Sequence, residues 1–243
     1  GDAIHQLLTE TDLKSVTAAE SKSAASELVK QSESCLRLMR AASDMDHCDW
    51  QVLKAGPATL LPHVSKARAL ARLSLLRARV RAAEGNLAGA AADVIDSYRL
   101  ARAIDHGVLV ETLVGLAIER QANQVTLELV PLLDKPTAQQ LHKQLESLPP
   151  AATFADSILA ERDVFGKWLL DQLEKHQAAA LLEALGGLGA SEIVGMFAGD
   201  PRETKAAVEE MVRQYDELAK LSQQPDAAQK LAHATRSLMQ QLN

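Results

Sequence analysis

Aromatic residues, cysteines and long uncharged runs are all scarce in this chain of 243 residues. It contains three Phe, two Tyr and two Trp. No window alternates β-branched or aromatic residues with polar ones, so strands are not expected. The longest stretch without a charged residue is 55–65, which is far shorter than the roughly 20 apolar residues that span a bilayer. We therefore expect no transmembrane segment.

The two cysteines, Cys35 and Cys48, leave two alternatives open. They could form a disulfide if the protein is exported, or they could be two buried thiols. The chain begins with Gly1-Asp2 rather than Met, so a signal peptide could have been removed.

The segment around the second cysteine contains residue types that can bind a metal ion. Its candidate ligands are His47, Cys48, Asp49 and His63. His47 and Cys48 are adjacent in sequence, so both can reach one ion only with unusual backbone geometry, and neither CxxC nor HExxH occurs. We expect no metal and no other cofactor. Instead, a buried Trp50 would hold this segment in place, with His63 bonded to a backbone group.

The charge distribution is uneven along the chain. The 26 basic and 32 acidic residues give a net charge of −6, which argues against a nucleic-acid binder. Residues 50–83, however, contain seven bases and no acid. At 100° per residue, Arg68, Arg72 and Arg79 lie within about 40° of one another on a helix. This row could bind an anionic ligand or an acidic partner through its guanidinium groups.

Acidic residues on the next two predicted helices offer the basic helix an internal alternative. They are Asp93, Asp96, Glu111 and Glu119. An antiparallel arrangement could bring these carboxylates within reach of the row, or of a second basic group formed by Lys66, Arg77 and Arg81. We favour internal pairing over an open anion site.

Hydrophobic periodicity predicts a series of helices. The first is expected over 17–42, and an irregular segment over 43–62 follows, because it lacks periodicity and contains Gly56-Pro57. Further helices are expected over 62–84, 87–105, 108–133, 137–148, 154–185 and 201–223, and from 225 onwards. Eight to nine helices with short connections predict an all-α antiparallel array or bundle.

The predicted domain organisation follows from one glycine-rich stretch. We expect a main helical domain over 1–185, a Gly-rich apolar connector over 186–199 and a C-terminal helical pair over 200–243. The connector's apolar side chains could contact a partner. They are Leu188, Ile193, Met196 and Phe197.

Two resemblances carry expectations about fold and origin. Ala78 and Ala82 precede the turn Gly85-Asn86, and Ala90 follows it; the region near 64–105 thus resembles a tetratricopeptide-type helical hairpin. The segments Cys48-Asp49-Trp50 and Leu60-Leu61-Pro62-His63 are similar to those of a family of uncharacterised bacterial helical proteins. That resemblance implies export to the periplasm or beyond, and it implies no activity.

Catalytic patterns are weak in this sequence. Glu161 and Asp163 are two residues apart on a predicted helix, so their carboxyls point in different directions and do not form an acid/base pair. No GxSxG motif occurs. We therefore expect a non-enzymatic helical interaction or scaffold protein that contacts a protein or peptide partner. The alternative is a small-ligand or anion-binding protein that uses Arg68, Arg72 and Arg79.

Overall fold

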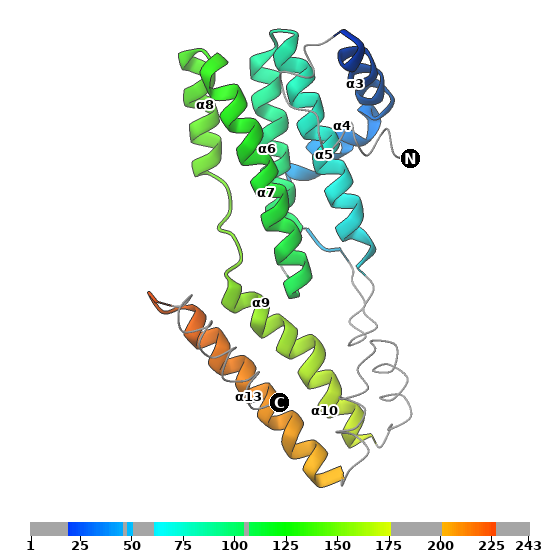
Figure 1. Ribbon diagram of the computed structural model, residues 1–243, viewed down its shortest axis with the longest axis vertical. Helices are drawn as coiled ribbons and strands as arrows, with labels where there is room; N and C mark the ends of the chain where they lie inside the picture. The colour runs from blue at the N-terminus through cyan, green and yellow to red at the C-terminus, as the bar shows by residue number, and fades with distance from the viewer. Residues whose placement is uncertain (1–18, 46–47, 51–60, 105–106, 176–200, 227–243) are drawn as a thin grey trace. The chain divides into compact units, whose positions relative to one another are not determined.

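The computed structural model describes residues 19–45, 48–50, 61–104, 107–175 and 201–226. Every regular element in these ranges is a helix (Figure 1), so the all-α prediction is confirmed. The α-helices are α3 (Ala19–Gln31), α4 (Glu33–Ser43), α5 (Pro62–Ala83), α6 (Leu87–Ile104), α7 (Leu109–Leu129), α8 (Lys135–Glu146), α9 (Phe154–Glu161), α10 (Lys167–Glu174) and α13 (Pro201–Ser222). None of the described helices is long and apolar enough to cross a bilayer.

Helices α5 and α6 form an antiparallel hairpin, as the sequence predicts. Pro62 lies in the first turn of α5, where its missing N–H is not needed. Gly85 ends the helix with φ of +82°, which a side chain would disfavour. The side chain of Asn86 then accepts a hydrogen bond from the Gly89 N–H at 3.0 Å and caps α6. The resemblance of this hairpin to a tetratricopeptide unit stays a prediction.

The core around this hairpin is built mostly from small and aliphatic side chains. Ala78, Ala90 and Ala122 are fully buried and let α5, α6 and α7 approach closely. Leu36 and Met39 of α4 pack at the other end of the same helices, where the cluster also contains Ile104 and Ile118. The two clusters bury apolar area along the length of the hairpin, so the hairpin is the centre of this part of the fold.

The predicted helix over 17–42 is two helices in the structure. Helix α3 ends at Gln31 and α4 begins at Glu33, although no Gly or Pro lies between them. Ala25 and Val29 of α3 pack against Leu76 and Val80 of α5, whereas α4 packs in the cluster that contains Leu36. The chain turns at Ser32 because these two helices bury their apolar faces against different parts of the hairpin.

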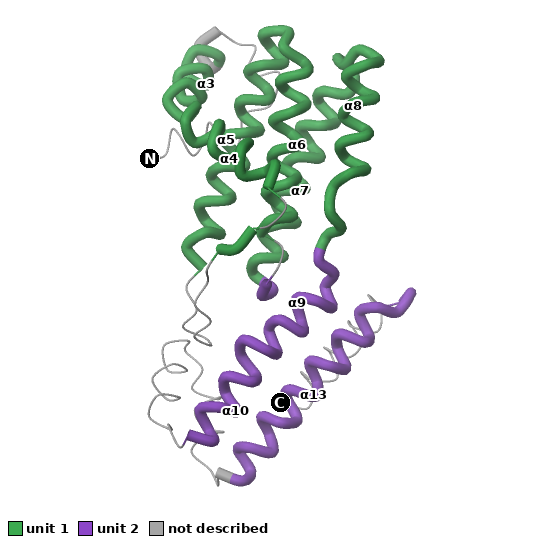
Figure 2. The backbone as a smooth tube through the Cα atoms, turned by 180° about the vertical axis from the view of Figure 1, so that it is seen from behind, with its two compact units in different colours: residues 1–50, 61–106, 110–151 green, residues 51–60, 107–109, 152–243 purple. Residues whose placement is uncertain are grey.

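The chain divides into two compact units (Figure 2). Unit 1 contains the described residues of 19–50, 61–104 and 110–151, and unit 2 contains those of 107–109, 152–175 and 201–226. The boundary after Ala151 follows Pro149-Pro150 and differs from the connector expected over 186–199. That connector lies outside the described residues.

Unit 2 is built on helices α9, α10 and α13. A π-helical turn, Arg162–Gly166, joins α9 to α10, so the described part of the predicted 154–185 helix is continuous but not uniformly α-helical. A Cβ on Gly166 would lie 2.9 Å from Val212 Cγ2 of α13. Glycine at this position therefore allows α13 to approach the turn closely.

Candidate functional site: a cavity beside a buried ion cluster

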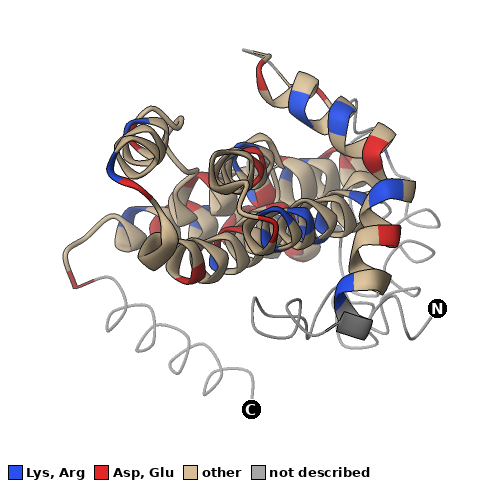
Figure 3. Cartoon of the chain, turned by 90° about the horizontal axis from the view of Figure 1, so that it is seen from above, with Lys and Arg blue, Asp and Glu red and all other residues tan. Residues whose placement is uncertain are grey.

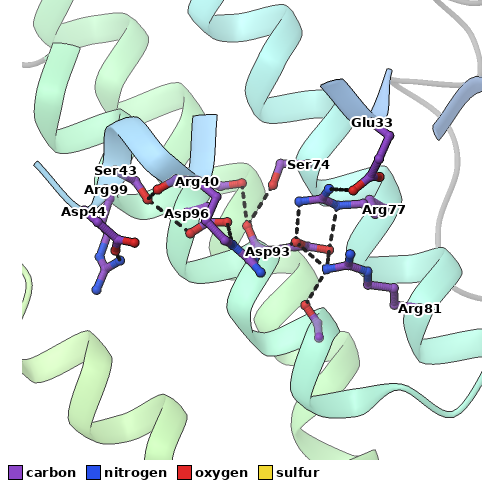
Figure 4. Close-up of polar contacts among 12 residues, drawn as sticks. Glu33, Arg40, Ser43, Asp44, Ser74, Arg77, Arg81, Asp93, Asp96 and Arg99 are labelled. Carbon is purple, nitrogen blue, oxygen red and sulfur yellow. Dashed lines mark hydrogen bonds and ion pairs between the residues drawn. The ribbon is translucent and has the colours of Figure 1, made fainter. Parts of the chain in front are cut away.

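The polar centre of unit 1 is Asp93, whose side chain is fully buried on α6 (Figure 4). Arg77 of α5 binds this carboxylate with two nitrogens, at 2.7 and 3.1 Å. Arg81 Nη1 lies 2.9 Å from both carboxylate oxygens, and Arg40 Nη2 of α4 lies 2.9 Å from Oδ1. Burial raises the pKa of Asp93, while Coulomb attraction and hydrogen bonds, those of Arg77 above all, oppose the rise.

Three further residues complete this ion cluster. Arg40 Nε donates to Asp96 Oδ2 at 2.7 Å, and Ser43 donates to the other oxygen of Asp96 at 3.2 Å. Arg77 Nη1 donates to Glu33 at 3.1 Å. The cluster therefore contains three guanidiniums and three carboxylates, so its formal charges balance. It ties α4 to the α5–α6 hairpin around the buried side chains of Arg77, Asp93 and Asp96, whereas those of Arg40 and Glu33 are partly exposed.

The three arginines of the predicted anion-binding row have different environments. Arg68 is exposed. Arg72 is partly buried, and its Nε has no hydrogen-bond partner among the described residues. Arg79 is bound by both oxygens of Glu128 on α7, at 2.7 and 2.8 Å. The row is therefore not a continuous open surface, because Arg79 is occupied by an internal carboxylate.

The remaining acids considered from sequence also have basic partners. Arg102 Nε lies 2.9 Å from Glu119 Oε1, but this ion pair lacks hydrogen-bond geometry at Nε, and Nε and Nη1 are both buried without hydrogen-bond partners in the described part of the chain. His63 Nε2 lies 2.8 Å from Glu111 Oε1, and both side chains are buried. Acidic and basic residues are interspersed over the described helices (Figure 3).

Two predictions about the segment before α5 are wrong. Trp50 is exposed, not buried: its ring stacks on His63 with centroids 5.0 Å apart, and its Nε1 donates to the Ala103 carbonyl at 2.9 Å. His63 binds the Glu111 carboxylate and not a backbone group. Trp50 nevertheless fixes this segment to the hairpin, because its ring stacks on His63 of α5 and its Nε1 donates to Ala103 of α6.

A cavity of about 660 Å³ opens beside the ion cluster, and all its lining residues belong to unit 1. We call it the Trp50 cavity. Its apolar walls are Met39, Ala42, Met45, Trp50, Leu70, Leu100, Ala103 and Pro149. Its polar lining residues are Ser43, Asp44, Cys48, Arg99, Arg102 and Ser147. The mixture of apolar walls and a few charged groups is typical of small-molecule sites.

The two arginines of the cavity differ in how they are held. Arg102 is paired with Glu119 and is largely buried. Arg99 Nη1 donates to Asp44 Oδ1 at 2.7 Å, and the Asp44 side chain is 65% exposed. Asp44 directly follows α4, and Arg99 lies on α6, so the pair spans the cavity wall (Figure 4). Water or a ligand can reach this pair more easily than it can reach the buried cluster.

Cys48 and Cys35 are both free and exposed in the structure. The disulfide between them is not formed here, and the alternative of two buried thiols is also wrong. Partial burial of the Cys48 thiol, followed by the nearby charge of Asp49, raises the pKa of Cys48. A raised pKa keeps the thiol protonated at neutral pH, and a protonated thiol is a weak nucleophile.

The other sequence candidates do not converge on a catalytic or metal centre. No group of three or more His, Cys, Asp or Glu residues able to hold a metal occurs in the described ranges, and His47 lies outside them. Asp163 pairs with Arg162 and, at 2.8 Å, with Lys167. The expected partner-contact residues lie in the undescribed range 176–200. They are Leu188, Ile193, Met196 and Phe197.

Sequence reasoning missed Arg99 and Asp44. Arg99 and Arg102 are three residues apart near the end of α6, so they share a face of the helix. That spacing was available in the sequence, but it did not show which arginine would be left accessible. Comparison of the chain with models of protein families, with curated proteins and with solved structures found no match.

Proposed function

We propose that this chain is a non-enzymatic binding protein whose ligand is a small molecule held in the Trp50 cavity. The observation that carries this proposal is the cavity itself. Its volume of about 660 Å³ lies within the range of small-molecule sites, and it is lined by residues of α4, α5 and α6, of the segment that ends at Trp50 and of the segment that follows α8.

The lining chemistry supports binding rather than catalysis. Cys48 is the strongest nucleophile among the lining residues, but its raised pKa disfavours the reactive thiolate. Asp44 is the lining carboxylate, and it is paired with Arg99. A nucleophile next to a general base, the arrangement that covalent catalysis needs, is therefore not found among these lining residues.

The Trp50 cavity replaces the arginine row as the place where a ligand would bind. Arg68, Arg72 and Arg79 do not line it, and Arg79 is held by Glu128. The expected protein or peptide partner stays a prediction, as do bacterial origin and export.

A neutral fluorescent probe, 1-pyrenebutanol, tests the proposal through Trp50. The variant Trp168→Phe leaves Trp50 as the sole tryptophan, so energy transfer from tryptophan to pyrene reports binding near the cavity. We expect saturable binding of one probe per chain.

Two neighbouring alanines of α4 provide a matched pair of variants. Ala41 and Ala42 are both exposed, but Ala42 lines the cavity and Ala41 does not. We expect Ala42→Phe to abolish binding by filling the cavity, and Ala41→Phe to leave it unchanged. Circular dichroism melting would show that both variants fold. Equal binding by the two folded variants would mean that the probe binds elsewhere, and the proposal would then be wrong.

A further inference from the structure

We propose that the ligand of the Trp50 cavity is an organic carboxylate on an apolar body, and that its carboxylate binds Arg99 in place of Asp44. This inference rests on the proposed function, because it assigns the ligand class of the same cavity. It follows from three features: how each arginine of unit 1 is paired, how easily Asp44 can leave, and what lines the rest of the cavity.

The ion pairs of the arginines indicate that Arg99 is the one that a ligand carboxylate could bind. Arg77 is 3% exposed and is bound to the buried Asp93. Arg79 is bound at both oxygens of Glu128, and Arg102 is largely buried beside Glu119. Arg99, in contrast, lines the cavity and is paired with the exposed Asp44. It is therefore the cavity guanidinium whose present partner a ligand could replace without exposing a buried carboxylate.

Asp44 is a weak ion-pair partner for Arg99. The residue follows the last turn of α4, where the partial negative charge of the helix end disfavours a carboxylate. Its side chain is 65% exposed, so the carboxylate can return to water without a large desolvation change. Exposed ion pairs contribute little free energy. An incoming carboxylate would form the same charge-assisted hydrogen bond and would leave the local charge balance of Arg99 unchanged.

The other walls of the cavity suit an apolar body. Met39 and Met45 are unbranched side chains that adapt to irregular shapes. Trp50 adds an aromatic wall that is fixed on one side by the stack on His63 and at its Nε1 by the Ala103 carbonyl. A ligand with a charged end at Arg99 and an apolar end against these side chains would satisfy both kinds of surface.

The experiment compares 1-pyrenebutyrate with 1-pyrenebutanol, which has the same apolar body without the charge. Both probes are titrated into the Trp168→Phe protein. The charge-assisted hydrogen bond to Arg99 favours the carboxylate by about tenfold, and the displacement of Asp44 offsets about threefold of this gain. We therefore expect the carboxylate to bind about threefold more tightly than the alcohol. Asp44→Asn removes the competing carboxylate, so it should raise the ratio of the pyrenebutyrate affinity to the pyrenebutanol affinity by about threefold.

Arg99→Gln should remove the preference for the carboxylate, measured as the ratio of the pyrenebutyrate affinity to the pyrenebutanol affinity. Arg68→Gln is the matched control, since it makes the same charge change at an exposed arginine that does not line the cavity. The inference is overturned if Arg99→Gln keeps the preference, or if Asp44→Asn weakens it. In either case pyrenebutanol binding that Ala42→Phe abolishes would still support the proposed function. If Ala42→Phe leaves pyrenebutanol binding unchanged, the proposed function itself is refuted.

Discussion

Replacing Asp93 by Asn should destabilise unit 1 more than any other single substitution in the ion cluster. Asparagine keeps the shape of the side chain but removes the charge that three arginines share. Arg77 is the costly partner, because it is 3% exposed and would keep only the half-exposed Glu33 as a carboxylate partner. Removing one partner of a buried ion pair costs about 3–5 kcal/mol.

The two other partners add less to this loss. The side chains of Arg81 and Arg40 are 24% and 38% exposed, so water can solvate them after the substitution, and each pair resembles a surface pair worth about 0–1 kcal/mol. The backbone carbonyl of residue 93 keeps its hydrogen bonds from Ser74 and Ser97. We therefore expect Asp93→Asn to lower the free energy of unfolding by about 4 kcal/mol.

Urea unfolding followed by Trp50 fluorescence measures this loss in unit 1. The Trp168→Phe background removes the signal from unit 2, and an unchanged m-value would show that the transition itself is the same. Arg81→Gln is the control and should cost about 1 kcal/mol or less. Arg77→Met should fall between the two variants, because Asp93 would keep Arg81 and Arg40. A loss below about 1 kcal/mol for Asp93→Asn would refute the assignment of Arg77 as a cation that depends on Asp93.

Three further substitutions test local features of the fold. Gly166→Ala should destabilise unit 2 by about 1–3 kcal/mol, since the new Cβ would meet Val212 Cγ2 at 2.9 Å, and adding Val212→Ala should restore most of the loss in thermal melts. Gly85→Ala should cost about 1–2 kcal/mol in urea unfolding, because φ is +82° there, and Gly85→Asn should cost less. Hydrogen bonds from the Thr153 side chain and then its backbone N–H lower the pKa of Asp156 below its unfolded value. Its stabilising effect is therefore present above about pH 3.9 and is lost as the pH falls through the folded pKa, so wild type and Asp156→Asn should converge in stability in acid.

Much of the helical pattern could be predicted because local signals mark the helix ends. Pro62 begins α5, and Gly85 with Asn86 separates α5 from α6. The break at Ser32 had no such signal. It arises from tertiary packing, since α3 and α4 bury their apolar faces against different parts of the hairpin. Periodicity within one helix cannot show where a neighbouring helix will lie, so the sequence predicted one helix here.

The candidate site was harder to predict, because it depends on which carboxylate each arginine binds. Asp93 lies within the apolar face of α6, between Ala90 and Val94. A carboxylate in such a position needs a buried cation, and Arg77, beside the buried Leu76 on α5, satisfies it. The position of Asp93 on the apolar face of α6 could therefore have predicted the ion cluster. It would have indicated Arg77 and Arg81, and not Arg68 and Arg72, as the arginines that bind a buried carboxylate.

The burial of each arginine's carboxylate partner also explains where a ligand could bind. A ligand cannot easily displace a carboxylate that is buried with its arginine, as Asp93 is, or largely buried, as Glu128 is, because separation would leave a charge poorly solvated. A carboxylate at the surface gives no such protection. Asp44 is a partner of this second kind, and the arginine it holds lines a cavity with apolar walls. Of the two cavity arginines, Arg102 is paired with the largely buried Glu119, so Arg99 is the one whose partner a ligand could displace.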